Sequence, residues 1–333
     1  MSLTTALLAL GLGSATGQPQ SITVIEVAKT KGDSSAPFGT VVGMVEIGPG
    51  TVILADDKHK ALHRWDVGPG RVSRFARSGQ GPGEVEVPVS LARRPHGGFA
   101  LYDLSRGVLL FDRTLQFERR FALQGGFVSN PKNITVLGDG SVVVAGGRLR
   151  DPRHLHHYSA TGDWLESFGD PPAGLTSTYS RVQTSGGALR ALPTGFLFSV
   201  GTPLRIVQFP GNTFASPSNL AEDTRLLPPL TEATVTGPPE PQSKGNPTFR
   251  WWHDRSTGVF SLTDGRIVNV VTRFYRGDSI WDLYNRNGKH LARGTIPRAY
   301  YAWDLAADGN ILASYRDPDT DEAIAVVLRL VLK

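Results

Sequence analysis

The chain has 333 residues, of which 40% are hydrophobic and 20% are charged. This balance is typical of a globular protein and excludes an extended disordered chain. The 35 basic and 30 acidic residues give a net charge of +5, and no dense Lys/Arg tract indicates a nucleic-acid-binding protein. Cysteine is absent, so disulfides, thiolate metal sites and thiol nucleophiles are excluded.

The first 17 residues have the pattern of a secretory signal peptide. An apolar run from Ala6 to Leu12 precedes small residues that include Ala15 and Gly17, as in the core and cleavage region of such a signal. The basic residues that normally precede the core are missing, which suggests that the signal is truncated at its start. The run is too short to span a bilayer, which needs roughly 20 apolar residues. We therefore predict an exported protein, periplasmic or extracellular, without a membrane span.

Beyond this segment the sequence is a succession of short apolar runs. Runs rich in Val, Ile, Leu, Phe and Tyr are bounded by Gly, Pro, Asp and Asn, as expected of β-strands. Tight turns of the kind that close hairpins recur at intervals that are mostly in the forties. These turns contain Gly50, Gly98, Gly140, Gly195, Gly265 and Gly309. A strand-only repeat of this length predicts an all-β propeller in which each repeat forms one four-stranded antiparallel blade.

Six such repeats fit into the chain. We expect them at residues 42–76, 87–121, 133–168, 188–209, 258–296 and 300–330. The sixth repeat lacks one strand, whereas the strand Ser21–Ala28 precedes the first repeat and belongs to none. This N-terminal strand is expected to complete the sixth blade, because ring closure removes an exposed sheet edge. The prediction is one six-bladed β-propeller domain over residues 18–333.

A Pro-rich insertion at about residues 210–254 interrupts the fourth repeat. Its prolines at 228, 229, 238, 239 and 241 disfavour regular strands, and it ends in the aromatic sequence FRWWH at 249–253. Long inserts without a strand pattern are commonly functional or disordered. Its tryptophans are therefore interpreted either as binding anchors or as side chains that pack between blades.

The connection into the second repeat carries a more specific signal. The segment FARSGQGPGEVEVPVSLARRPHGGFALYDLSRGVLLFD (75–112) contains a glycine-rich turn, a Gly-Gly hairpin and an Asp that closes the second strand. It resembles the NHL repeat, and its Gly79–Glu84 portion, GQGPGE, is similar to the glycine-rich signature of bacterial exported six-bladed β-propeller proteins. The resemblance implies that fold and no established reaction. Because a strand follows rather than a helix, we interpret the loop as a connector between blades and not as a phosphate cradle.

Polar side chains concentrate on one predicted face of the propeller. The loops between the second and third strands, together with the insertion, are longer and more charged than the turns on the opposite face. They predict a non-catalytic binding module whose partner is a protein, a peptide or a carbohydrate, without nucleic acid and without a cofactor. The candidate binding residues are Lys58, His59, Arg106, Arg148, Arg150, Arg153, Trp251, Trp252, Arg276 and Arg316.

A catalytic alternative stays open. No G-x-S-x-G, H-E-x-x-H or P-loop motif occurs, which favours a protein that is not an enzyme. Some six-bladed propellers, however, are calcium-dependent hydrolases or lactonases with a site at the central channel. Here Glu46, Asn133 and Asp304 lie on or beside predicted inner strands and are the candidate Ca²⁺ ligands. His154 and His156 share one face of a strand, where packing is favoured over metal binding.

Overall fold

In the computed structural model the described part of the chain consists of strands, turns and bends, without a helix. The described residues are 20–33, 36–125, 128–148, 151–170, 187–200, 204–211, 214, 216–223, 255–273 and 276–333. The predicted signal peptide lies outside these ranges, as does the insertion from residue 224 onward. The strands form four separate four-stranded sheets, one eight-stranded sheet and one two-stranded sheet.

Each four-stranded sheet is an antiparallel meander of consecutive strands. The first contains β4 (Val41–Gly48), β5 (Thr51–Asp56), β6 (Ala61–Asp66) and β7 (Arg71–Ala76). The second contains β8 (Pro88–Arg93), β9 (Phe99–Asp103), β10 (Gly107–Phe111) and β11 (Phe117–Phe121). The third contains β12 (Val128–Val136), β13 (Val142–Arg148), β14 (Leu155–Tyr158) and β15 (Trp164–Phe168). The fourth contains β16 (Gly187–Ala191), β17 (Phe196–Val200), β18 (Leu204–Phe209) and β19 (Ser218–Asp223).

The eight-stranded sheet has two halves that meet at the N-terminal strand. One half contains β20 (Arg255–Ser261), β21 (Ile267–Arg273), β22 (Asp278–Tyr284) and β23 (His290–Ile296). The other contains β24 (Tyr301–Leu305), β25 (Ile311–Arg316), β26 (Ala323–Leu332) and β1 (Gln20–Thr30). Two parallel residue pairs between β1 and β23 join the halves, at Gln20 and Ser21. The two-stranded sheet pairs β2 (Gly32–Asp33) with β3 (Ala36–Pro37).

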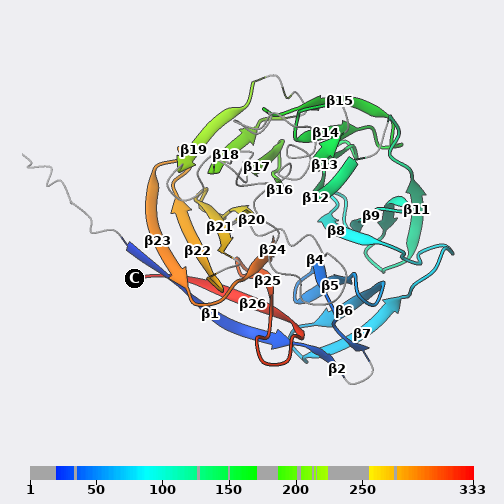
Figure 1. The fold of residues 1–333 in the computed structure, drawn as a ribbon, viewed down its shortest axis with the longest axis horizontal. Helices are drawn as coiled ribbons and strands as arrows, with labels where there is room; N and C mark the ends of the chain where they lie inside the picture. Colours follow the sequence, from blue (N-terminus) through cyan, green and yellow to red (C-terminus); the bar gives the residue numbers. More distant parts are fainter. Residues whose placement is uncertain are drawn as a thin grey trace, which may run out of the picture.

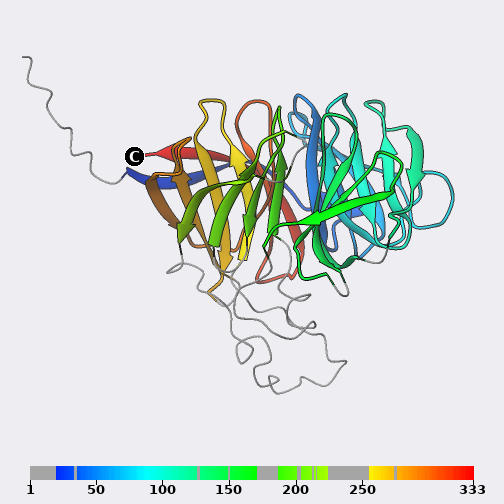
Figure 2. The same cartoon turned by 90° about the horizontal axis from the view of Figure 1, so that it is seen from above.

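The sheets are the blades of a β-propeller. Their first strands, β4, β8, β12, β16, β20 and β24, follow one another around the centre in Figure 1. Each contacts the next, and β24 contacts β4, so the ring is closed. Seen edge-on in Figure 2, the blades stand side by side in one layer. Side chains at the centre can therefore meet even when they come from distant parts of the sequence.

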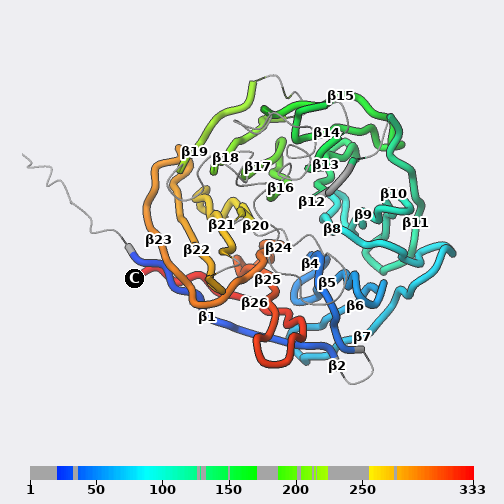
Figure 3. The backbone as a smooth tube through the Cα atoms, in the orientation of Figure 1, coloured from blue at the N-terminus to red at the C-terminus, as the bar shows by residue number. Residues whose placement is uncertain are grey.

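The N-terminal strand closes the ring as predicted. β1 pairs antiparallel with β26, from Ile22 opposite Leu332 to Thr30 opposite Ala325, and Figure 3 shows the C-terminus beside β1. Ile22 is buried in a core shared by both halves of the eight-stranded sheet. Glu26 accepts hydrogen bonds from Arg298 Nη1 and from the Tyr300 hydroxyl, at 2.6 and 2.7 Å. Apolar burial and charged contacts thus both hold the strand.

The middle strands of the blades form the core because their two faces pack against neighbouring blades. The described residues of β9 and β17, for example, are all buried. Outer strands keep more polar residues, as in β11, where three consecutive residues are exposed. Three Asp-Gly turns close first hairpins, and in each the Asp carboxylate accepts the N–H two residues further on. The glycines at 140, 265 and 309 have positive φ angles, which these turns require.

The glycine-rich connector encloses one arginine. Arg106 is buried and donates to the carbonyl oxygens of the loop residues Gly79, Gln80, Gly81 and Glu84, at 2.6 to 3.3 Å. The Glu84 carboxylate in turn accepts the Gly81 N–H at 2.8 Å. Because these four residues of the glycine-rich loop contribute main-chain carbonyl oxygens, the loop can wrap tightly around the guanidinium. The expected connector role is consistent with these contacts.

Two boundaries differ from those expected. The outer strand β19 (Ser218–Asp223) lies inside the stretch that the sequence assigns to the insertion, so the insertion begins later than residue 210. Its sequence SNLAED is largely polar and contains no buried residue, so a hydrophobic pattern does not reveal the strand. β12 begins at Val128, earlier than the expected start of the third repeat at residue 133. A register irregularity between Ser129 and Asn133 interrupts its alternation.

The buried histidines of the third blade predict a pH-dependent stability. Burial lowers the pKa of His154 to about 3 and that of His156 to about 4, because the imidazolium would lose its hydration. Both stay neutral in the folded protein but bind protons near pH 6.5 when unfolded. The free energy of unfolding should therefore fall as the pH drops from about 6.5 to about 4, by ~3 kcal/mol for His156. Urea unfolding across this range checks the slope, and His156→Gln should make it shallower; equal slopes would refute the assignment.

Candidate functional site

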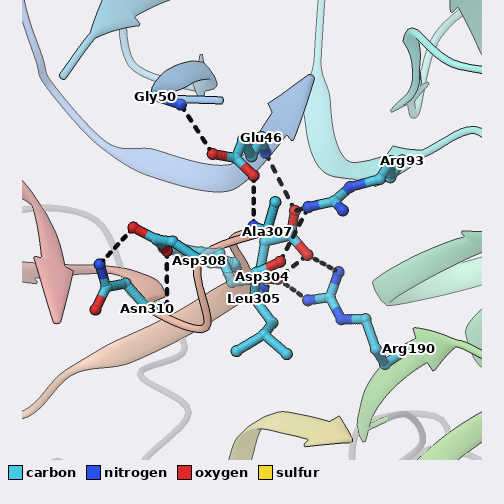
Figure 4. A network of polar contacts seen from close by, with 10 residues as sticks. Glu46, Gly50, Arg93, Arg190, Asp304, Leu305, Ala307, Asp308 and Asn310 are labelled. Atoms are coloured by element: carbon cyan, nitrogen blue, oxygen red, sulfur yellow. Dashed lines mark hydrogen bonds and ion pairs between the residues drawn. The ribbon is translucent and has the colours of Figure 1, made fainter. Parts of the chain in front are cut away.

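A buried carboxylate at the centre of the ring organises a polar network, shown in Figure 4. Asp304 is 3% exposed on the inner strand β24. Its Oδ1 accepts from Arg190 Nη1 at 2.8 Å and from its neighbour's backbone, Leu305 N, at 2.9 Å. Its Oδ2 accepts from Arg93 Nη2 at 2.9 Å and from Glu46 N at 3.1 Å. The four contacts use the lone pairs of the carboxylate.

This network crosses the propeller axis. Arg93 ends β8 and Arg190 lies near the end of β16, and neither strand is a neighbour of β24 in the ring. Their contacts with Asp304 must therefore pass through the centre, as the converging side chains in Figure 4 indicate. All three residues lie near the carboxyl ends of inner strands. The network thus lies at the end of the axis that carries the short turns between first and second strands.

Glu46 supports this arrangement from β4. It is 6% exposed, and its carboxylate accepts Gly50 N at 3.0 Å and Ala307 N at 2.7 Å. These hydrogen bonds tie the β4–β5 turn to the β24–β25 turn. The backbone N–H of Glu46 at the same time contacts Asp304. Glu46 therefore fixes the position of Asp304 in the ring.

The two arginines differ in how many N–H groups remain available to bind a ligand. Arg190 is largely enclosed: it also donates to the Trp303 carbonyl and lies 5.1 Å from the Phe260 ring, and burial lowers its pKa. The Arg93 side chain is 43% exposed. Its Nη2 donates to Asp304 and to the Leu305 carbonyl, whereas Nε and Nη1 make no hydrogen bond with the described residues. Arg93 can therefore donate to a carbonyl, carboxylate or oxyanion of a ligand.

The candidate calcium ligands do not form a calcium site. Glu46 and Asp304 do meet, as expected of them, but the contacts above occupy both carboxylates and two guanidiniums flank Asp304. Two adjacent positive charges oppose a divalent cation. Asn133 lies half-buried on β12 and makes no hydrogen bond in the network. In the described ranges no group of three His, Asp or Glu could hold a metal ion. The histidines of the third blade therefore belong to no such group.

Several candidate binding residues on the loops have contacts within the protein. His59 Nδ1 lies 2.8 Å from Oδ2 of the buried Asp56, which also accepts the backbone N–H of Lys58. Arg316 donates to the Gly39 carbonyl and to the Thr40 hydroxyl. These contacts, like those of Arg106, join the blade connections to the loops. They give structural roles to residues of the predicted binding face without testing ligand binding.

Three of the remaining candidates lie in the described part of the chain. Arg148 lies over the Trp164 ring at 5.1 Å, and Arg153 pairs with Asp151 at 2.8 Å. Arg276 is exposed in the turn between β21 and β22. Arg150, Trp251 and Trp252 lie outside the described residues. None of the contacts above joins one described candidate to another across blades.

The two arginines at the centre, Arg93 and Arg190, were not predicted as site residues from the sequence. Arg93 and Arg190 lie in otherwise ordinary inner strands, and their partner is 211 or 114 residues away. One signal could have indicated them: a carboxylate at 304, in a strand that must face the centre, needs a cation or several N–H donors when buried. Which residues supply them depends on ring geometry.

No family model matches the chain, and no curated protein matches it in sequence. Many solved structures are similar in fold. A Bacteroides fragilis protein described as exported has a TM-score of 0.59 and 12% identity, over 94% of this chain and 96% of that one. A calcium-binding regucalcin of Agrobacterium tumefaciens has a TM-score of 0.54 and 13% identity, over 91% of this chain and 95% of that one. A gluconolactonase of Xanthomonas campestris has a TM-score of 0.56 and 11% identity, over 94% of this chain and 96% of that one.

Identities this low show the fold alone, and they place the chain among β-propellers. The prediction of a non-catalytic binding module is wrong, because the solved propellers of similar fold include a protein described as a gluconolactonase. In the described part of the chain, no helix is long and apolar enough to span a bilayer.

Proposed function

We propose that this protein is an exported hydrolase of the lactonase class, with its site on the propeller axis. The observation that carries the proposal is Arg93, held by Asp304 at the centre of the ring with part of its guanidinium unused. Propellers of similar fold that are described as gluconolactonases give the reaction class. The substrate class is accordingly a lactone of a sugar acid, which agrees with the expected carbohydrate partner.

In such a reaction a water oxygen adds to the lactone carbonyl carbon, and negative charge develops on the carbonyl oxygen. The ring C–O bond then breaks, the ring oxygen takes a proton and becomes a hydroxyl, and the acid releases a proton to the solvent. Arg93 is placed to donate N–H groups to the developing oxyanion and then to the carboxylate product. Removing one such donor typically costs about 10²–10³ in rate. Asp304 and Glu46 act as positioning residues, because their lone pairs are already engaged.

The described carboxylates on the axis do not fit a calcium ion. Regucalcin is described as calcium-binding, but the carboxylates on this axis are neutralised by arginines or bonded to the backbone. Charge stabilisation in this proposal comes from the guanidinium alone.

We also infer that the ring contains six blades of the NHL-like type. The two halves of the eight-stranded sheet each have four strands and are joined only at Gln20 and Ser21, so each counts as one blade. Two observations support export: the apolar run at the N-terminus and the similar fold of a Bacteroides fragilis protein that is described as exported.

The direct test is hydrolysis of γ- and δ-lactones of sugar acids by the purified protein, with the released acid measured by pH-stat titration. We expect saturable hydrolysis above the buffer rate that is equal in EDTA and in added calcium. A linear ester of the same acid serves as a substrate control and should react more slowly. A rate equal to buffer for every lactone would refute the proposal, and activity that requires calcium would refute the role of Arg93.

A further inference from the structure

A polar cavity lies at the outer edge of the propeller, away from the network on the axis. It has a volume of about 220 Å³ and lies between β19 of one blade and β22 and β23 of the next. Both β19 and β23 are outer strands in Figure 1. The cavity is lined by Glu222, Asp223, Tyr284, His290 and Arg293.

A buried carboxylate fixes two of the lining side chains. Asp282 is fully buried and accepts from His290 Nε2 at 2.8 Å and from Arg293 Nε at 2.6 Å. Arg293 Nη2 also reaches Asp223 at 2.6 Å, which links the two blades. The His290 and Arg293 side chains remain 44% and 39% exposed. Their orientation is therefore set before any ligand arrives, which lowers the entropic cost of binding.

The backbones of the two walls also approach each other closely. Gly288, in the β22–β23 turn, has φ +81°, and a Cβ there would lie 1.5 Å from the Leu220 carbonyl oxygen on β19. Only glycine permits this approach. Tyr284 is 4% exposed and packs edge-on against His290 at 5.3 Å. Burial raises the pKa of Tyr284, so its hydroxyl stays protonated and can donate.

We propose that this cavity binds a small neutral polyol, namely a single sugar ring. The carboxylates of Glu222 and Asp223 would repel an anion. Asp223 and Asp282 are already paired with Arg293, which weakens their attraction for a cation. The lining instead alternates acceptors with N–H and O–H donors, which matches hydroxyl groups that each donate and accept. The volume equals that of about seven water molecules, which is enough for one sugar ring.

The test is saturation-transfer NMR and calorimetric titration of the full chain with glucose, galactose and mannose. Butylamine and acetate serve as cationic and anionic probes. We expect millimolar binding of at least one sugar, and weaker binding of both charged probes. Glu222→Gln and Tyr284→Phe should each weaken the sugar affinity about fivefold, since each removes hydrogen bonds worth about 1 kcal/mol or more. Glu86→Gln, in the connector between the first two blades, is the matched control and should leave the affinity unchanged.

Each other outcome overturns the proposal. No sugar binding at all, tighter binding of butylamine than of any sugar, or equal affinity in wild type and both cavity variants would do so. Arg93→Ala separates this site from the axis, because it should leave sugar binding at the rim intact whether or not the protein hydrolyses lactones. Loss of rim binding in that variant would place the sugar at the axis instead.

Discussion

Replacement of Asp103 by alanine is expected to lower the free energy of unfolding by about 3–5 kcal/mol. The carboxylate is fully buried at the end of β9. It accepts the backbone N–H of Glu86 and Val87 in the blade connection, at 2.7 and 2.9 Å, and those of Ser105 and Arg106 in the next loop. Without it, both segments lose their common anchor and buried N–H groups lose their acceptor.

Chemical denaturation of the two proteins measures this loss. Asp112→Ala is the matched control, because Asp112 in the same blade also accepts backbone N–H groups but lies in an exposed turn. It should destabilise the protein far less than Asp103→Ala. Equal effects of the two substitutions would show that burial of the Asp103 carboxylate does not matter, and would contradict this account of the connector.

Removal of the N-terminal strand should have a still larger effect. Deleting residues 1–30 takes away the strand that pairs with β26 over nearly its full length and leaves an open blade edge. It also removes the buried Ile22 and the Glu26 contacts with Arg298 and Tyr300. The expected loss is roughly 5 kcal/mol or more, comparable to the total stability of many domains.

Thermal unfolding followed by circular dichroism is the measurement, together with the oligomeric state of whatever remains soluble. Deletion of residues 1–19 alone is the control, because it leaves β1 complete. The shorter deletion should unfold as the full chain does, whereas the longer one should melt at a much lower temperature or aggregate through its exposed edge. Similar melting of the two truncated chains would show that ring closure contributes little.

The architecture could be predicted because it is encoded locally. Alternating short apolar runs and Asp-Gly turns mark hairpins one at a time, and the unmatched strand before the first repeat indicated how the ring closes. The prediction failed at β19 (Ser218–Asp223), whose exposed outer position requires no apolar alternation. A strand that forms because it pairs with its neighbour, without apolar alternation of its own, is difficult to predict from sequence.

The site was less predictable because it is assembled across the ring. Glu46 and Asp304 were expected near the centre, and they do contact each other. Their partners Arg93 and Arg190 come from blades that are not adjacent to β24, so no local spacing relates them. The arginines change the chemistry of the site. Without them the two carboxylates would suit a calcium ion, whereas with them Asp304 forms ion pairs.

The central claim is that Arg93 on the axis promotes lactone hydrolysis. The most direct measurement is kcat/KM for the best lactone in wild type, Arg93→Ala and Arg71→Ala, where Arg71 is an exposed residue of an outer strand. Arg190 and two backbone N–H groups still bind Asp304 without Arg93, so the variant should fold. We predict a loss of about 10²-fold in kcat/KM for Arg93→Ala and almost none for Arg71→Ala. Equal kcat/KM in wild type and a folded Arg93→Ala would contradict the claim.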